Sequence, residues 1–346
     1  MLGHARAHRA AHISQLRHAR PPGPVVRLPH MRVDLVAPPP ADLPSGNNAT
    51  ARRWAAILRE LGHRPRLRWD DAPGDADLLI ALHAVKTRRA LLAFRRAHPD
   101  RPAVVALTGT DIYGRRNLAP ALDAATFIVA LQPRALTALS RAHRVKARVI
   151  FQSAEPPRAL PAKPSREFRV AVVGHLRAVK DPLRTALAVR ELPEDSRIVV
   201  RHAGRALSES FARRARAEMD RNPRYRWLGE LTPGRVRRLI ASSHLVAITS
   251  LAEGSCNVLS EALAAHTPVV ATRIPGLMGT LGAHYPGYFR PRDTRKLTRL
   301  LRRAEGDAAF YRQLAAACRR ATPLVDPRRE RAAWRALLAE LAARRP

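Results

Sequence analysis

Two glutamates eight positions apart flank a small polar loop in SLAEGSCNVLSEALA, residues 250–264. A β-branched run ends just before Glu253, and Glu261 lies in an apolar helical pattern. The first N–H groups of a helix have no partners within the helix, and its dipole favours an anion there. The pattern predicts a site for the diphosphate and sugar hydroxyls of a nucleotide sugar. The alternative explanation is a helix start that Ser255 and Asn257 merely cap, with acids that complement the helix dipole.

We expect this loop and helix start to bind the donor, with Glu261 against the ribose and Glu253 near the transferred sugar. The predicted donor ligands from this stretch are Glu253, Gly254, Ser255, Asn257, Val258 and Glu261.

A basic cluster follows another β-branched run, in VVGHLRAVKDP at residues 172–182. Gly174 permits close approach of the backbone to a ligand. His175, Arg177 and Lys180 follow it, and arginine and lysine are the usual counter-charges of a diphosphate. The basic cluster and the glutamate pair together predict a diphosphate site more specifically than either does alone.

Short apolar runs alternate with amphipathic helical patterns along most of the chain, which predicts parallel sheets covered on both faces. The predicted strands fall in two series, at 32–38, 77–84, 103–109, 126–132 and 148–153, then at 169–176, 197–204, 225–231, 244–250 and 268–273. A proline-rich break at 153–168 separates the series. We therefore predict two doubly wound Rossmann-like domains that face each other across a cleft.

Four segments follow from this pattern. They are a disordered N-terminal extension at 1–30, an N-terminal acceptor-side domain at 31–160, a C-terminal nucleotide-sugar-binding domain at 161–325 and a C-terminal helix at 326–346. The extension is rich in arginine and histidine and lacks acids. It fits a transit peptide, or an upstream stretch if translation starts at Met31.

The formal net charge of +34 raises the alternative of a nucleic-acid-binding protein. The basic residues are spread over nearly every predicted helix, and aromatic residues make up only 5% of the chain. That composition offers no base-stacking platform, so we expect no specific nucleic-acid partner. There is no run of 18 apolar residues and the two cysteines are far apart, which favours a cytoplasmic protein without a transmembrane segment. The oligomeric state stays open.

The basic cluster and the glutamate pair resemble the retaining GT-B glycosyltransferases of family 4. Gly174 and Lys180 keep that family's spacing, whereas His175 stands where the family has arginine. Further strings resemble the selenosugar synthases of selenoneine biosynthesis, at 43–63, 81–113, 131–133, 149–156, 222–231 and 285–289. The resemblance implies that selenium of selenophosphate attacks the anomeric carbon of UDP-N-acetylglucosamine or UDP-glucose. UDP and phosphate leave, and a 1-seleno sugar remains.

The resemblance also implies an acceptor site on the first domain. Its predicted residues are Gly46, Asn47 and Asn48 in SGNN, and Thr108, Gly109, Thr110 and Asp111 in TGTD. His83, Lys180 and Glu253 are the predicted catalytic residues. Turn, cap or core roles are the alternatives for His83, SGNN and Asp111. We expect no metal and no cofactor, with the UDP-sugar and selenophosphate as substrates. Transfer to a hydroxyl of a glycan, lipid or small molecule is the alternative activity.

Overall fold

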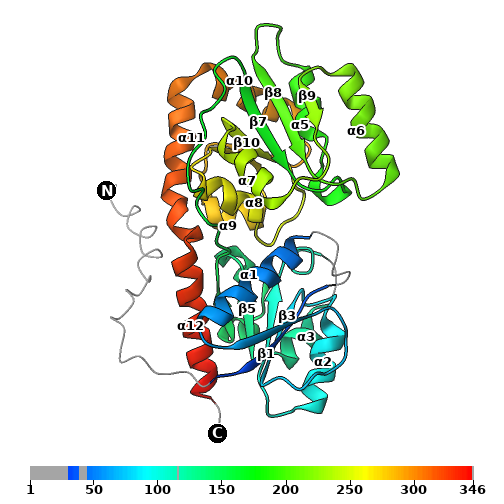
Figure 1. The fold of residues 1–346 in the computed structure, drawn as a ribbon, viewed down its shortest axis with the longest axis vertical. Helices are drawn as coiled ribbons and strands as arrows, with labels where there is room; N and C mark the ends of the chain where they lie inside the picture. The colour runs from blue at the N-terminus through cyan, green and yellow to red at the C-terminus, as the bar shows by residue number, and fades with distance from the viewer. Residues whose placement is uncertain (1–29, 39–44, 115–116, 345–346) are drawn as a thin grey trace, which may run out of the picture.

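A computed structural model describes residues 30–38, 45–114 and 117–344, and it contains two six-stranded parallel sheets (Figure 1). The first sheet has the order β2-β1-β3-β4-β5-β6. Its strands are β1 (Arg32–Val36), β2 (Arg64–Arg68), β3 (Leu78–Leu82), β4 (Ala103–Leu107), β5 (Phe127–Ala130) and β6 (Ala147–Val149). The second sheet, β12-β11-β10-β7-β8-β9, comprises β7 (Phe168–Val173), β8 (Ile198–Ala203), β9 (Tyr225–Trp227), β10 (Leu245–Ile248), β11 (Val269–Thr272) and β12 (Tyr288–Phe289).

Helices cover both faces of each sheet, as the apolar strands require. The first domain carries α1 (Gly46–Glu60), α2 (Arg88–Ala97), α3 (Ala119–Ala124), the 3-10 helix η1 (Pro133–Ala138) and α4 (Arg141–Val145). The second carries η2 (Ala178–Lys180), α5 (Arg184–Arg190), α6 (Glu209–Arg221), α7 (Pro233–Ala241), α8 (Asn257–Ala264), α9 (Pro275–Leu281), α10 (Thr294–Gly306) and α11 (Ala308–Ala321). Two apolar clusters flank the first sheet and one continuous cluster fills the second domain. The predicted pair of doubly wound domains is confirmed.

The chain crosses between the domains twice. The first crossing is the irregular stretch between β6 and β7, and the second runs through η3 (Thr322–Val325) into α12 (Pro327–Ala342). Figure 1 shows α11 and α12 following one another along one side of the molecule, with α12 beside the first domain. Trp334 of α12 is fully buried there and meets Trp54 of α1 edge-on, with ring centroids 4.7 Å apart. The C-terminal helix therefore completes the core of the N-terminal domain.

Several predicted boundaries differ from the structure. β2 and β12 were not predicted, since RPRLR has no apolar run and β12 has only two residues. β9 ends at Trp227 and not near residue 231. α1 begins at Gly46 because Ser45 caps it by accepting the Asn48 N–H. The predicted extension falls outside the described residues except for His30, which is exposed. Among the described helices, none has both the length and the apolar character that a membrane crossing requires.

We predict that Trp334→Ala destabilises the protein by about 3–5 kcal/mol, because it leaves a cavity against Trp54 in a core that α12 closes. Urea unfolding followed by circular dichroism measures the loss. Arg335→Ala, at the exposed neighbouring position, is the control and should change the free energy of unfolding by less than about 0.5 kcal/mol. Equal stability of the Trp334 variant and the wild type would contradict the packing described above.

Candidate active site

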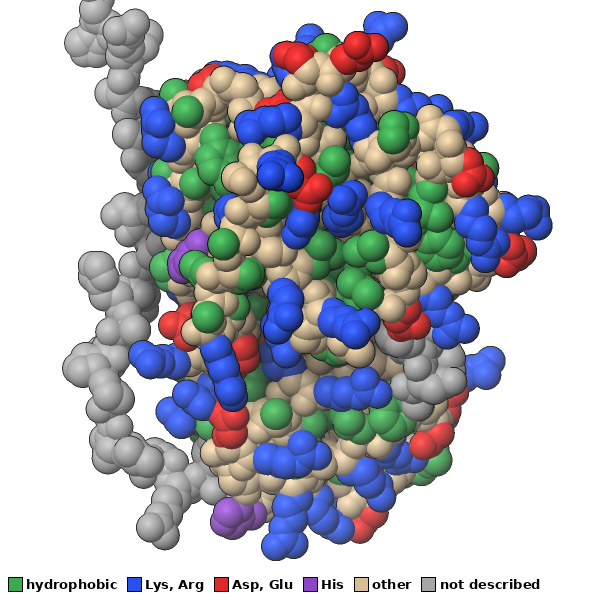
Figure 2. Space-filling view, turned by 45° about the horizontal axis from the view of Figure 1, so that its top comes forward, with side chains coloured by type: hydrophobic (Ala, Val, Ile, Leu, Met, Phe, Trp, Pro, Cys, Tyr) green, Lys and Arg blue, Asp and Glu red, His purple; other side chains and the backbone are tan. Residues whose placement is uncertain are grey.

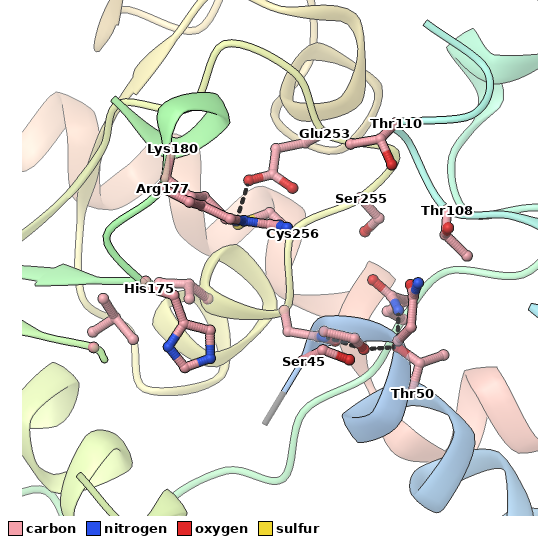
Figure 3. A pocket seen from close by; sticks show the side chains of 18 of the residues that line it. Ser45, Thr50, Thr108, Thr110, His175, Arg177, Lys180, Glu253, Ser255 and Cys256 are labelled. Atoms are coloured by element: carbon pink, nitrogen blue, oxygen red, sulfur yellow. Dashed lines mark hydrogen bonds and ion pairs between the residues drawn. The ribbon is translucent and has the colours of Figure 1, made fainter. Parts of the chain in front are cut away.

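A cavity of about 310 Å³ lies between the two domains, where the carboxyl ends of their strands face each other (Figure 3). Loops and helix starts that follow the strands line it, as expected for a doubly wound sheet. The first domain contributes Pro38, Ser45, Gly46, Asn47, Thr50, His83, Lys86, Thr108, Thr110, Leu131 and Gln152. The second contributes chiefly Gly174, His175, Arg177, Lys180, Gly204, Leu207, Glu230, Leu231, Val236, Glu253, Ser255, Cys256, Asn257 and Val258.

An ion pair between Lys180 and Glu253 dominates the second-domain wall (Figure 3). Lys180 Nζ lies 2.5 Å from Glu253 Oε1, and the two side chains are only 20% and 11% exposed. Burial is the largest single influence on Lys180 and lowers its pKa, but the charge and hydrogen bond of Glu253 together with Cys256 outweigh burial, and the pKa is raised. Lys180 therefore stays protonated at neutral pH and offers a fixed positive charge to a ligand in the cleft.

Hydrogen bonds between the loop after β7 and the loop after β10 hold the Lys180–Glu253 pair in place. The hydroxyl of Thr249, which follows β10, donates to the Lys180 carbonyl at 2.9 Å. The Leu251 N–H donates to the Val179 carbonyl at 2.8 Å. The basic cluster after β7 and the glutamate loop after β10 thus form one surface, since β7 and β10 are neighbours in the sheet.

The start of α8 lies on the same wall, but its cap is not the predicted one. Ser255 and Asn257 were expected to cap the helix, whereas the N-cap residue is Cys256, whose side chain makes no capping hydrogen bond. Burial raises the pKa of the Cys256 thiol to about 12, so the side chain is neutral. The helix start is left without a polar side-chain cap beside Lys180, which suits an anion.

Two predicted donor residues do not line the cavity. Gly254 packs against Gly109 of the other domain, and a Cβ on Gly254 would lie 2.4 Å from the Gly109 nitrogen. Glu261 is mostly buried one turn into α8, and burial raises its pKa to about 7, against the charges of Arg237 and Arg53. Its predicted contact with a ribose stays a prediction.

His83 lines the first-domain wall in a strained conformation, with φ of +84° at the end of β3. Its Nδ1 accepts the N–H groups of Val85 and Lys86, at 3.3 and 3.2 Å. The hydrogen is therefore assigned to Nε2, which lies 3.1 Å from Thr110 Oγ1 and donates to it. His83 thus acts as a donor in this structure and has no free nitrogen to accept a proton from a substrate. Its predicted catalytic part stays a prediction.

Three of the seven predicted acceptor residues turn away from the cleft. The fully buried Asp111 carboxylate accepts backbone N–H groups of Ala84, Thr108, Gly109 and Ile112 and so holds its own loop together. Asn48 is buried and accepts the indole N–H of Trp69 at 3.1 Å. Gly109 contacts Gly254 as described. Gly46, Asn47, Thr108 and Thr110 do line the cavity.

Several residues that line the cavity were not predicted from the sequence. Lys86 is one of few lysines and lies three positions after His83, so its position gave a usable signal. Leu207, Leu231 and Val236 are apolar lining residues from the second domain, and Glu230 lines the cavity as well. They belong to no motif, and only the fold brings them to the cleft. Within the described residues no group of three acidic, histidine or cysteine side chains is placed to hold a metal ion.

Basic side chains do not gather into one surface on the face shown in Figure 2, where they alternate with acidic and hydrophobic ones. Many arginines bind nearby acids, as Arg190 and Arg221 bind Glu218. This dispersal resembles a solvated arginine-rich surface more than a nucleic-acid interface.

The second part of the chain matches a known protein family. The sequence model of the family described as Glycosyl transferases group 1 matches residues 155–321, just under half of the chain. This range contains both the basic cluster and the glutamate pair. The second domain therefore carries the sequence pattern of group 1 glycosyl transferases. A comparison with curated proteins finds no match.

Solved structures resemble the whole fold. Anabaena Alr3699/HepE, solved in complex with UDP and glucose, is 19% identical with a TM-score of 0.70, over 91% of this chain and 100% of that chain. Sucrose-phosphate synthase from Thermosynechococcus elongatus is 16% identical with a TM-score of 0.74, over 91% and 100%. A glycosyltransferase from Rickettsia africae ESF-5 is 14% identical with a TM-score of 0.73, over the same shares. These similarities confirm the predicted GT-B fold.

We predict that Glu261→Gln stabilises the ligand-free protein at pH 8 and not at pH 4.5. The folded pKa near 7 exceeds the ordinary value of 4.5, so the folded state binds the extra proton and stability falls as pH rises between these values. The glutamine variant carries no ionisable group at this site, so its free energy of unfolding at pH 8 should exceed that of the wild type by about 1–3 kcal/mol. Urea unfolding at both pH values measures it. Glu194→Gln, at an exposed site, is the control, and a gain independent of pH would contradict the buried carboxyl.

Proposed function

We propose that this chain is a glycosyltransferase that transfers the sugar of UDP-N-acetylglucosamine or UDP-glucose to the selenium of selenophosphate. The observation that carries the transferase part is the buried Lys180–Glu253 pair beside the start of α8, inside the range that matches group 1 glycosyl transferases. The UDP and glucose bound to Anabaena Alr3699/HepE support a UDP-sugar as donor. The selenium acceptor rests on the resemblance of the first domain to selenosugar synthases.

The second-domain wall suits the parts of a UDP-sugar in order. The apolar lining residues Leu207, Leu231 and Val236 offer a surface for a flat base. The diphosphate then lies toward Arg177, Lys180 and the start of α8, where charge and backbone dipoles favour an anion. The sugar follows toward Glu253, whose loop reaches the first domain. This order brings the anomeric carbon to the seam between the domains, where an acceptor on the first domain can approach it.

The proposed reaction needs stabilisation of the leaving group more than it needs a general base. An anionic selenium needs no deprotonation, which agrees with a His83 that donates from Nε2 and accepts at Nδ1 from the backbone. Selenium forms a bond to the anomeric carbon, and the bond from that carbon to the UDP oxygen breaks with its electron pair. Lys180 stabilises the negative charge that develops on the diphosphate. Water then cleaves the Se–P bond and releases phosphate and the 1-seleno sugar.

The test is to incubate the purified protein with each UDP-sugar and selenophosphate and to measure UDP release and the product mass. A seleno-sugar mass with stoichiometric UDP supports the proposal. If the sugar is transferred to an alcohol and not to selenophosphate, the assignment as a glycosyltransferase stands and the proposed acceptor is wrong. Absence of UDP binding by calorimetry would overturn the donor assignment itself.

We predict that Lys180→Ala lowers kcat by about 10²–10³-fold, because it removes a charge aimed at the leaving group. Its KM for the UDP-sugar should change less, since Arg177 and the start of α8 remain. Steady-state UDP release measures both constants. Lys296→Ala, at an exposed site on α10, controls for the general loss of a lysine, and a Lys180 variant with wild-type kcat would refute the role.

A further inference from the structure

The first-domain wall of the cleft is positively charged and carries no acidic side chain among its lining residues. Its ionisable side chains are His83 and Lys86. The acids that line the cleft, Glu230 and Glu253, both come from the second domain, and Glu253 is already paired with Lys180. A wall of this kind favours a negatively charged ligand over a neutral one.

Lys86 is an exposed residue in the loop that follows β3, and it forms no ion pair with any part of the chain that the structure describes. The carboxylate of Asp111, a fully buried acid of that domain, accepts four backbone N–H groups and forms no ion pair with Lys86. Lys86 therefore lines the cleft as a lysine that no acid of the described residues compensates.

Two threonine hydroxyls belong to the same wall, and His83 links them to Lys86: its Nδ1 accepts the Lys86 N–H at 3.2 Å, and its Nε2 lies 3.1 Å from Thr110 Oγ1. Thr108 Oγ1 is buried and has no hydrogen-bond partner among the described residues. Thr110 Oγ1 accepts from His83 Nε2, so its own hydrogen is free to point to a ligand. Figure 3 shows Thr108 and Thr110 side by side across the cleft from Lys180 and Arg177. A buried donor left unpaired is unfavourable, and a bound oxyanion would accept its hydrogen bond.

This wall also lies next to the donor side. Gly109, between the two threonines, contacts Gly254, which follows Glu253: a Cβ on Gly109 would lie 2.0 Å from the Gly254 nitrogen. The loop that carries the threonines therefore touches the loop that carries the predicted sugar ligand. A ligand held by Thr108 and Thr110 lies within reach of the transferred sugar.

We infer that Lys86, with the hydroxyls of Thr108 and Thr110, binds the phosphate group of the acceptor and so selects a phosphorylated acceptor over a neutral alcohol. This assignment rests on the proposed function. It adds the residues that recognise the acceptor and explains why a negatively charged acceptor is preferred. Lys86 supplies a mobile point charge and the threonines supply directed donors. A neutral acceptor leaves the Thr108 hydroxyl unpaired and the Lys86 charge uncompensated, which is the kind of loss that discriminates strongly between substrates.

The test measures binding of thiophosphate, a stable oxyanion, by calorimetry with and without saturating UDP. Lys86→Met should weaken thiophosphate binding at least tenfold and leave the Kd for UDP unchanged, while Lys86→Arg keeps most of the binding. Thr108→Val, which removes only the hydroxyl, should weaken it by a smaller factor. Lys296→Met, at an exposed lysine outside the cleft, is the matched control and should bind like the wild type.

Two results overturn the inference: a wild type that binds no thiophosphate, or a Lys86→Met variant that binds it as tightly as the wild type. UDP binding reports separately on the proposed function. If UDP does not bind but thiophosphate still depends on Lys86, the donor assignment fails and the oxyanion site stands. If UDP binds and thiophosphate does not, the donor site stands and the oxyanion site fails.

Discussion

One buried carboxylate, that of Glu330 in α12, connects the C-terminal helix to the first domain and to the chain crossing between the domains. It accepts hydrogen bonds from the Trp54 indole at 2.7 Å, from Arg53 Nε at 2.9 Å, and from the backbone N–H and hydroxyl of Ser153. These partners belong to α1 and to the first crossing between the domains, and the Glu330 side chain is fully buried. Because a buried charge is stable only when it is well paired, these groups must meet at one point.

This constraint extends to the cleft through Arg53. Its Nη1 donates to Asn257 Oδ1 at 3.2 Å, and Asn257 Nδ2 donates to the Gly46 carbonyl at 3.2 Å. Asn257 begins α8 and Gly46 begins α1, so the starts of these two helices are connected to each other and, through Arg53, to α12. The C-terminal helix therefore contributes to the site by setting the distance between its walls, although the cavity contains none of its residues.

The fold could be predicted from the sequence wherever a strand or helix has its own local pattern of apolar residues. Apolar runs predicted most strands, and the rule that ligands lie at strand ends correctly brought Lys180 and Glu253 together. Prediction from the sequence failed where the interacting residues are far apart in the chain. Arg66 and Arg68 of β2 form ion pairs with Asp34 of β1, and no local sequence pattern reveals that pairing. The sequence also could not tell which polar residues of a loop face inward. Asp111 points to backbone groups because its loop folds around it, and that depends on tertiary contacts.

The lysines on the two walls of the cleft differ in whether an acid compensates their charge. This difference fits the proposed transfer of a sugar from an anionic UDP-sugar to an anionic acceptor. On the donor side, Glu253 compensates Lys180, which keeps a buried lysine charged and oriented before a diphosphate arrives. On the acceptor side, Lys86 is exposed and has no such acid, so a ligand itself must supply the counter-charge. A pre-paired lysine serves a leaving group whose charge grows during the reaction. An uncompensated one attracts a nucleophile that is already charged, and the touching loops at Gly109 and Gly254 bring the two within reach.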